Sequence, residues 1–540
     1  MDELASAERQ FEDSTKRRRF GVIVFLGCGV AVQYWVRSAA TVAVRRAARR
    51  YDWSGWMMPV ALSAFFVGYL VGQVPAALMA YRTSARTTLG LSVLATALLN
   101  LALVPCLASA KLVIVLRVLC GLAQAATFPS LYSLASEWAG SSETSRAIGT
   151  AKALGESGGA LIGLAGSMLL IDVRLTLPGG AHVGGLSLIF FVPAAFGLLW
   201  AVLLFACVPP HAPAPLRKAP DAAPPQSPAL QVEGRALPRP LPSAAVWRAL
   251  LCDTDCRVLY ANHFAVSCFN YLLLTQLPEF CEAGLGLSGA FAAAVVASPY
   301  VTFFFALIAA GRAADAAISR RSGGDGETAA AARATVRTRI QVTGLVGSSA
   351  AMVLCGGGAA RMAAPAAVPA AVALLNVAAL FLATTGVGFG AVYLDLTKDA
   401  AGLLYAVSNV FATLAGVAVP QWTHIILAAA GPRYGWTFAF ATSGYIGCGA
   451  ATLWRRPAPG NDGRQTRSRE WHHKGSIHAR GKTRHAKDGG QRRNTATSGS
   501  GPVSPSRSSA RRASTPARPS RPRTSPGRSS STEAGNSKTA

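Results

Sequence analysis

Charged side chains are scarce in this chain: only 14% of its 540 residues are Asp, Glu, Lys or Arg, whereas 51% are hydrophobic. Acidic residues are the rarer sign, since 25 Asp and Glu stand against 52 Lys and Arg. The charges crowd into the first 20 residues, a central stretch and everything after about residue 455, which leaves long apolar stretches between them. Too little charge remains to cover the water-facing surface of a soluble protein, and the composition excludes that class.

Motifs of enzymes and metal sites are also missing from the sequence. We find no phosphate-cradling glycine loop with Lys, no cluster of metal ligands and no nucleophile motif in context. The ten cysteines mostly lie in apolar stretches, and the one close pair, Cys252 and Cys256, has no His or Cys partners at zinc-ligand spacing. We therefore expect no enzyme activity, metal or cofactor, and we interpret the cysteines as small buried hydrophobic residues.

Twelve apolar stretches are long enough to cross a membrane. A hydrocarbon core of about 30 Å needs about 20 apolar residues of helix, and a lipid-exposed backbone must satisfy its own hydrogen bonds. The sequence therefore predicts an all-α membrane protein with twelve transmembrane helices in two six-helix bundles. The predicted spans are residues 20–48, 57–80, 87–108, 111–136, 147–171, 184–208, 256–281, 290–318, 339–358, 366–394, 399–426 and 434–454.

Composition also divides the chain outside these spans. Residues 209–255 carry PPHAPAP and PPQSPAL and cannot hold a continuous helix, because proline lacks the amide donor. We interpret this segment as a cytoplasmic linker between a bundle over residues 20–208 and a bundle over residues 256–454. Residues 1–19 are expected to form a cytoplasmic segment. Residues 455–540 have almost no large apolar side chains, and we expect a disordered tail.

That tail is strongly basic, with 20 Lys or Arg against 4 Asp or Glu, a formal +16 of the chain's +27. Such a run could bind nucleic acid, but it lacks interleaved aromatic residues and any recognisable nucleic-acid-binding fold. Membrane proteins often carry basic cytoplasmic tails, so we expect contact with solvent or with lipid headgroups instead.

Lys and Arg in short loops predict the orientation, because these residues resist translocation. Four loops that follow even-numbered spans, together with Lys16 to Arg19 and the tail, place both termini in the cytoplasm. A cluster of arginines at the outer end of the first span opposes this orientation. It is one site, whereas four loops and both ends of the chain support the orientation. The chain opens with acidic residues and a long apolar stretch, so we expect no cleavable signal peptide. The sequence carries no readable address for the plasma membrane or an organelle. The loop residues are Arg82, Arg86, Arg146, Arg217, Lys218, Arg235, Arg239, Arg320, Arg321, Arg333 and Arg337, and the opposing cluster is Arg45, Arg46, Arg49 and Arg50.

Several strings resemble one transporter family in their order and spacing. They are AFFVGYLVGQVPAALMAYR, LRVLCGLAQAATFPSLYSLASEWAGSSETSR, NYLLLTQLPEF, SPYVTFFFALIAAGRAAD, TVRTRI and YLDLTKDAAGLLYAVSNVFATLAGVAVP. Over about residues 20 to 454 the chain resembles the anion:cation symporter family of the major facilitator superfamily. This family, solute carrier family 17, includes sodium/phosphate cotransporters, sialin and the vesicular glutamate transporters. The resemblance implies the major facilitator fold and alternating access between two bundles around a central cavity.

Two arginines within predicted spans are candidates for substrate binding. Arg37 lies about 25 Å from the cytoplasmic face and Arg117 about 9 Å below the outer face, at 1.5 Å per residue, so both are in the outer half of the membrane. An Arg within hydrocarbon is costly, and its planar fork suits a carboxylate or a phosphate. Either residue could instead snorkel or pair with a structural carboxylate. The resemblance places the family's binding arginines at these two positions.

Four positions depart from the pattern that the resemblance implies. The family has an acidic residue, tied to proton coupling and gating, where this chain has Gln124, and glutamine cannot titrate. The vesicular glutamate branch has an Arg and a His where this chain has Val266 and Leu62, which disfavours glutamate as the substrate. The asparagine of phosphate-type members is replaced by Ala39.

Glu156 is the candidate for ion coupling. It lies in KALGESGGA, where flanking glycines let helices approach closely, and it could carry the proton that Gln124 cannot. Alternatively it forms an ion pair with Lys152, four residues earlier on the same face, or with one of the two arginines. The sequence leaves these alternatives open.

The remaining ionisable residues in or near the spans fall at cytoplasmic helix ends. There we expect helix caps and contacts of a cytoplasmic gate between the bundles rather than contact with substrate. These gate candidates are Glu143, Arg146, Asp315, Asp395 and Lys398.

Two functions from different classes agree with these observations. The first is a secondary transporter of a small organic or inorganic anion, coupled to protons, sodium or the membrane potential. The second is a membrane sensor or scaffold that has lost transport and acts through its basic tail. Arg37, Arg117 and the gate residues favour the first function, whereas Gln124 and Ala39 favour the second.

Overall fold

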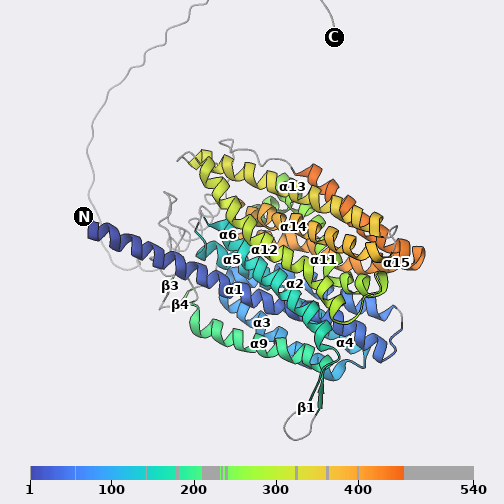
Figure 1. The fold of residues 1–540 in the computed structure, drawn as a ribbon. Coiled ribbons are helices and arrows are strands. Elements are labelled where there is room, and N and C mark those ends of the chain that lie inside the picture. Colours follow the sequence, from blue (N-terminus) through green and yellow to red (C-terminus); the bar gives the residue numbers. More distant parts are fainter. Residues whose placement is uncertain are drawn as a thin grey trace, which may run out of the picture. The chain divides into compact units, whose positions relative to one another are not determined.

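Helices dominate the computed structural model, as the apolar stretches predicted (Figure 1). All described residues fall within one compact unit, Met1–Gly475. The predicted tail over residues 455–540 lies outside the described residues. The structure describes residues 2–54, 56–140, 143–176, 182–209, 231–232, 235–236, 241–322, 326–359, 364–397 and 400–454.

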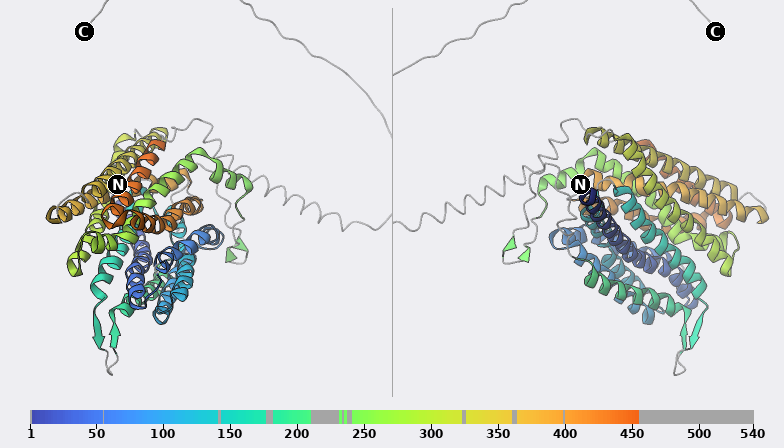
Figure 2. Two further views of the ribbon diagram at one scale, coloured as in Figure 1. Left: turned by 90° about the vertical axis from the view of Figure 1, so that its right-hand side faces the viewer. Right: turned by 60° about the vertical axis from the view of Figure 1, so that its left-hand side comes forward.

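The first half of the chain builds helices that end before the predicted linker. The first helix begins 18 residues before the predicted span, because its charged leading segment is also helical. A short antiparallel hairpin pairs Arg174 with Gly184 and projects between the fifth and sixth spans (Figure 2). The elements are α1 (Asp2–Arg50), α2 (Met57–Arg82), α3 (Ala85–Cys106), α4 (Ala110–Gln124), α5 (Thr127–Trp138), α6 (Thr144–Lys152), η1 (Ala153–Gly158), α7 (Gly159–Leu161), η2 (Ile162–Gly166), α8 (Ser167–Leu170), β1 (Arg174–Thr176), β2 (His182–Gly184) and α9 (Gly185–Cys207).

The second half contains five long helices. Three short elements precede them within the predicted linker: β3 (Gln231–Val232), β4 (Arg235–Ala236) and α10 (Ala244–Cys252). The others are α11 (Thr254–Glu279), η4 (Phe280–Gly284), α12 (Gly289–Arg321), α13 (Gly326–Ala359), α14 (Ala364–Leu396) and α15 (Ala401–Leu453). The backbone of α15 leaves helical geometry at Gly431, whose φ is +71°, so two predicted spans join there across a kink.

Ten helical segments of the described residues are long and apolar enough to cross a membrane. Two predicted spans are helical without meeting that criterion: α11, which carries polar residues such as Asn262 and His263, and the part of α15 after Gly431. The predominantly helical architecture with long apolar helices is therefore confirmed, and the count of twelve crossings stays a prediction.

Two spans of the first half are interrupted. The fourth is divided into α4 and α5 at Ala125 and Ala126, just before Pro129, which cannot donate an amide to the preceding turn. The fifth passes through two π-helical turns, η1 and η2, within its glycine-rich sequence. Such turns are frequent at functional sites, and η1 carries Glu156.

Glycines in the fifth span allow close packing on α1. A Cβ added to Gly155 would lie 2.5 Å from Val30 Cγ1, and one added to Gly163 would lie 1.9 Å from Ser38 Oγ. Only a residue without a side chain fits at these distances. The sequence prediction that glycines beside Glu156 let helices approach closely therefore agrees with the packing.

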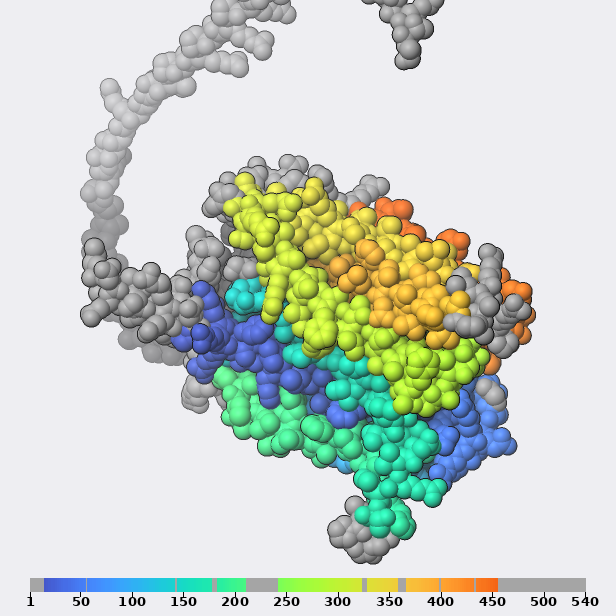
Figure 3. Space-filling model, in the orientation of Figure 1, coloured from blue at the N-terminus to red at the C-terminus, as the bar shows by residue number. Residues whose placement is uncertain are grey.

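The two halves of the chain meet along several helices. The fifth span packs against α12, and α2 packs against α15. Figure 3 shows the surfaces of the fifth span, in teal, and of α12, in yellow-green, side by side. Residues from both halves can therefore share a site in the interior.

The α1 contact generates a stability prediction. Gly163→Ala would overlap Ser38 and Trp35, so we expect a loss of about 1–3 kcal/mol of folding free energy and a lower melting temperature. Gly166→Ala is the matched control, because its nearest neighbour would be 3.9 Å away. Thermal unfolding of both purified variants in detergent checks this. Equal melting temperatures of the Gly163→Ala and Gly166→Ala variants would contradict the close packing of the fifth span on α1 at Gly163.

Candidate functional site

Arg37, on α1, is a buried cation enclosed by aromatic rings. Its guanidinium carbon lies 4.5 Å from the ring centres of Tyr34 and Phe65 and 4.6 Å from that of Tyr69. Its Nη2 donates to Gln124 Oε1 at 3.2 Å, whereas Nε and Nη1 have no hydrogen-bond partner among the described residues. Aromatic faces attract a cation but accept no strong hydrogen bond, so two nitrogens of the fork still lack acceptors.

Arg117, on α4, is also buried but is held by the backbone. Its Nε donates to the carbonyl of Ala61 and its Nη2 to the carbonyl of Leu62, both at 3.3 Å. Its guanidinium carbon lies 5.4 Å from the centre of the Phe65 ring, the same ring that contacts Arg37. The structure thus brings together the two arginines that the sequence placed at similar depth, and it gives them different partners.

Gln124 lies beside Arg37 and orients its guanidinium. Its side-chain oxygen accepts the hydrogen bond from Arg37, and its Nε2 has no partner among the described residues. An amide can align the guanidinium without neutralising it, so Arg37 keeps its full charge for another partner.

Glu156, on η1, forms an ion pair with Lys152. Lys152 Nζ lies 2.7 Å from Glu156 Oε1, with the lysine side chain 5% exposed and the glutamate side chain 13% exposed. Of the ion-pair partners that the sequence left open, Lys152 is the one that the structure shows, and the coupling role of Glu156 stays a prediction. Glu156 also borders a small pocket whose lining includes Tyr34, Tyr271 and Tyr300.

The second half contributes a polar cluster that sequence reasoning missed. His263 Nδ1 of α11 lies 2.9 Å from Ser408 Oγ of α15 and 3.1 Å from the Tyr393 hydroxyl of α14, and these two oxygens are 2.7 Å apart. A lone histidine in an apolar span was the signal that could have found it. Nearby, Tyr132 of α5 donates to the carbonyl of Gly390 at 3.0 Å, which joins the two halves.

The predicted gate residues gather at the start of α6. Asp315 of α12 accepts from the amides of Ser145 and Arg146 at 3.1 and 2.8 Å, capping α6 from the other half of the chain. Arg146 also pairs with Glu143 at 2.8 Å. The predicted gate residue Lys398 lies outside the described residues.

Arg337 of α13 completes this cluster, although the sequence marked it only as a loop cation. Its Nη1 donates to Ser145 Oγ at 2.7 Å, and its Nε lies 3.1 Å from Asp395 Oδ2. We call these contacts around Arg337, Asp395, Ser145 and Asp315 the Arg337 network. It links α6 of the first half with α12, α13 and α14 of the second.

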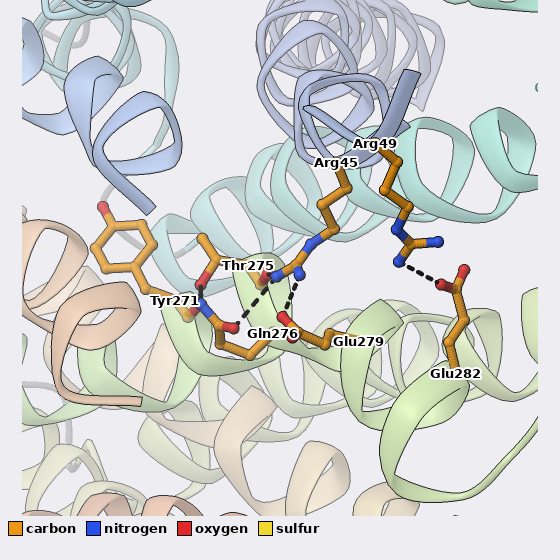
Figure 4. A network of polar contacts seen from close by, with 7 residues as sticks. All are labelled: Arg45, Arg49, Tyr271, Thr275, Gln276, Glu279 and Glu282. Atoms are coloured by element: carbon orange, nitrogen blue, oxygen red, sulfur yellow. Dashed lines mark hydrogen bonds and ion pairs between the residues drawn. The ribbon is translucent and has the colours of Figure 1, made fainter. Parts of the chain in front are cut away.

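A second network of polar contacts joins the two halves at the later part of α1 (Figure 4). Arg45 of α1 pairs with Glu279 and donates to the carbonyl of Thr275 at 2.7 Å and to Gln276 Oε1 at 3.2 Å. Nearby, Arg49 pairs with Glu282 at 3.1 Å. We call the contacts of Arg45 and Arg49 the Arg45 network, which links α1 with α11 and η4.

The length of α1 separates the two networks. Arg146 of the first network lies over the ring of Phe20, 5.0 Å from its centre, at the early part of α1. Phe20 and Arg45 are 25 residues apart on this helix, about 38 Å at 1.5 Å per residue. Arg37 lies between them, so contacts between the halves are present on both sides of the buried arginines.

Acidic side chains pair with Arg45, Arg46 and Arg49, three arginines of the cluster that opposes the predicted orientation. Arg46 pairs with Asp172 at 2.9 Å, and the other two pair with glutamates of the second half. The cytoplasmic placement of the termini stays a prediction.

Comparison with known proteins identifies the family. The model of the Major Facilitator Superfamily matches residues 26–420. The "Probable anion transporter 7" of Oryza sativa subsp. japonica is 29% identical over 361 residues, covering 66% of this chain and 75% of that protein. The vesicular glutamate transporter 2 of Homo sapiens is 24% identical over 465 residues, covering 78% of this chain and 73% of that protein.

Solved structures agree in fold. The proton:xylose symporter XylE has a TM-score of 0.58 at 13% identity, with 81% of this chain and 95% of that chain covered. The fucose:proton symporter FucP of E. coli has a TM-score of 0.52 at 14% identity, with 81% and 99% covered. At such identities the likeness shows the fold alone.

The family match spans the long helices of both halves and both arginines, and the relatives are transporters rather than enzymes. The resemblance seen in the sequence is thereby confirmed. The chain is an integral, multi-pass membrane protein that belongs to the major facilitator superfamily and is related to its anion transporters.

Proposed function

We propose that this protein is a secondary active transporter that moves a small organic or inorganic anion, of the phosphate or carboxylate class, by alternating access. The observation that carries the proposal is Arg37, a buried guanidinium with two nitrogens that lack a hydrogen-bond partner among the described residues. A buried donor without an acceptor is costly, and a carboxylate or phosphate offers the oxygens that this fork accepts. The relatives named as anion transporters support this chemistry.

Arg117 adds a second positive charge to the same place. Because the carbonyls of Ala61 and Leu62 hold its guanidinium, its position is fixed before an anion arrives. We assign Arg37 the direct contact and Arg117 electrostatic attraction, with Gln124 aligning the fork of Arg37. Preset charges of this kind bind an anion without a large cost of reorganisation.

The Arg45 and Arg337 networks serve as the two gates in this proposal. Each joins helices of the first half to helices of the second, and they lie on opposite sides of Arg37. Rocking of one bundle against the other would break one network while the other persists. The anion would then reach Arg37 from one side at a time.

Glu156 is the proposed coupling residue. A proton could neutralise this carboxylate at the border of the pocket, whereas Gln124 cannot take one. Proton movement, sodium or the membrane potential remain the possible driving forces, and transport measurements separate them.

Reconstitution tests the function itself. Purified protein in proteoliposomes is offered labelled phosphate, glutamate, sialate and urate under imposed pH, sodium and potential gradients. Uptake of any of these anions above empty liposomes supports the proposal. No binding and no uptake for the whole panel would instead favour the sensor or scaffold function, which tail deletion then tests.

Arginine geometry generates the next prediction. Arg37→Lys keeps the charge but loses the planar fork, so we expect uptake to fall about 10-fold or more. We expect Arg117→Lys to reduce uptake less than Arg37→Lys does, because the lysine ammonium can still donate to a backbone carbonyl. Arg248→Lys, at an exposed position on α10, is the matched control. Full activity of both test variants would remove these residues from the site.

The Arg45 network predicts a change in access. Glu279→Gln removes a part-buried charge partner, which weakens closure by about 1–2 kcal/mol and raises the open fraction about 5- to 30-fold. A cysteine introduced at Thr41, buried and one turn from Arg45 on the same face, reports opening by its labelling rate with maleimide. Glu282→Gln is the control, since its pair with Arg49 is exposed and contributes little. Equal labelling in both variants would show that Arg45 and Glu279 do not hold this end closed.

The proposed coupling of transport to protons at Glu156 generates a further prediction. Glu156→Gln should abolish the acceleration of uptake by a pH gradient and leave counterflow exchange largely intact, because exchange needs no net proton movement. Gln124→Glu in the same background should restore some pH dependence. Wild-type uptake that ignores pH and follows sodium or potential would make Glu156 structural.

A further inference from the structure

Lys152 is a buried ammonium that stands between the two halves of the chain. It ends α6, and its side chain extends toward two glycines of α14: a Cβ added to Gly386 would lie 3.6 Å from Lys152 Cε, and one added to Gly390 would lie 4.0 Å from Cδ. The rings of Phe128 and Phe389, from opposite halves, lie 5.6 and 5.8 Å from its Nζ. The side chain of Lys152 thus lies between groups of both halves of the chain.

Among the described residues, Glu156 forms an ion pair with the Lys152 ammonium. The carboxylate pairs with Lys152, while the residue also borders the small pocket lined by Tyr34, Tyr271 and Tyr300. A buried ion pair adds little net stability, because desolvation of both charges offsets their attraction. An ionisable pair kept at such depth therefore calls for a function beyond holding one helix turn together.

Lys152 lies one pair of rings away from Arg37. The Tyr34 ring contacts the Arg37 guanidinium at 4.5 Å and packs edge-on against Phe128, with ring centres 6.0 Å apart. Phe128 in turn contacts Lys152 Nζ. The close packing of Gly159 against Tyr34 fixes the fifth span to this part of α1. An anion bound at Arg37 that extends past these rings meets the Lys152 ammonium next.

We propose that Lys152 is a substrate-contacting residue and that Glu156 acts as its internal substitute anion. This inference rests on the proposed transport of an anion. As the anion binds, its negatively charged oxygen replaces Glu156 Oε1 at the ammonium, and Glu156 takes up one proton from the bulk solvent on the side from which the anion enters. The pair begins as one positive and one negative charge. It ends as the same ammonium, the bound anion and a neutral carboxylic acid, so one anion enters with one proton.

This exchange keeps a buried charge from losing its partner in any step. An ammonium left alone in an apolar interior is strongly destabilising, and so is a lone carboxylate. In the exchange, Lys152 always has one anionic partner and Glu156 has either the ammonium or a proton. The two bundles can then rearrange with or without the anion at similar electrostatic cost.

The titratable and charged groups around the pair come from several helices. Among the residues that the structure describes, none of these groups is a second carboxylate, so Glu156 is the acid proposed to accept the proton. They are Tyr34 and Arg37 of α1, Tyr132 of α5, His263 and Tyr271 of α11, Tyr300 of α12, Tyr393 of α14 and Tyr405 of α15.

The test measures anion binding by the full-length protein in detergent between pH 5.5 and 8. The probe is the member of the phosphate, glutamate, sialate and urate panel that the wild type binds. We expect wild-type affinity to fall as the pH rises, because Glu156 must take a proton for the anion to bind. Glu156→Gln should bind the probe with no such pH dependence.

Lys152→Met with Glu156→Gln removes both charges and so avoids an unpaired buried carboxylate. We expect its affinity to be about 10-fold or more below that of Glu156→Gln alone, because a charge-assisted contact is lost. Lys111→Met, at an exposed position near the start of α4, is the matched control and should bind as the wild type does.

Two results would overturn the inference. One is a double variant that binds as tightly as Glu156→Gln alone, and the other is a Glu156→Gln variant that keeps the wild-type pH dependence. The second measurement stands even if the double variant fails to fold. If Arg37→Lys loses binding while the double variant keeps it, the proposed function survives and Lys152 is structural. If the wild type binds no probe, the proposed function itself fails.

Discussion

A guanidinium inside a membrane protein needs partners, and the arrangement around Arg37 follows from how this chain supplies them. Three rings attract its charge and Gln124 aligns it, but two of its nitrogens have no hydrogen-bond partner among the described residues. Arg117 raises the positive potential beside the same Phe65 ring. Both positions are flanked by contacts between the halves, so access to this cation depends on which network opens.

Hydropathy and helix depth were enough to predict part of this structure. Apolar length placed the helices, and the rise per residue placed Arg37 and Arg117 at similar depth, where the structure brings them to one ring. Depth along a helix leaves open which neighbour a side chain faces. For that reason the partner of Glu156 stayed undecided until the packing of η1 was known.

Other features could not be predicted because they depend on contacts distant in sequence. Arg45 and Glu279 are 234 residues apart, and no local pattern connects them. Taken alone, Arg45 counted against the orientation, whereas its partner explains its presence. His263 gave one weak signal, a single histidine in an apolar span, and its partners Tyr393 and Ser408 lie on two other helices.

The glycine contacts between α1 and the fifth span have a mechanical consequence. Gly155, Gly159 and Gly163 bring the two backbones so close that neither helix can slide along the other without steric overlap. Arg37 on one and Glu156 on the other therefore travel as parts of a single rigid body. In the proposed transport cycle, the distance between the proposed anion site at Arg37 and the proposed proton site at Glu156 therefore stays constant, and the wall that can move is the face of α14 that carries Phe389.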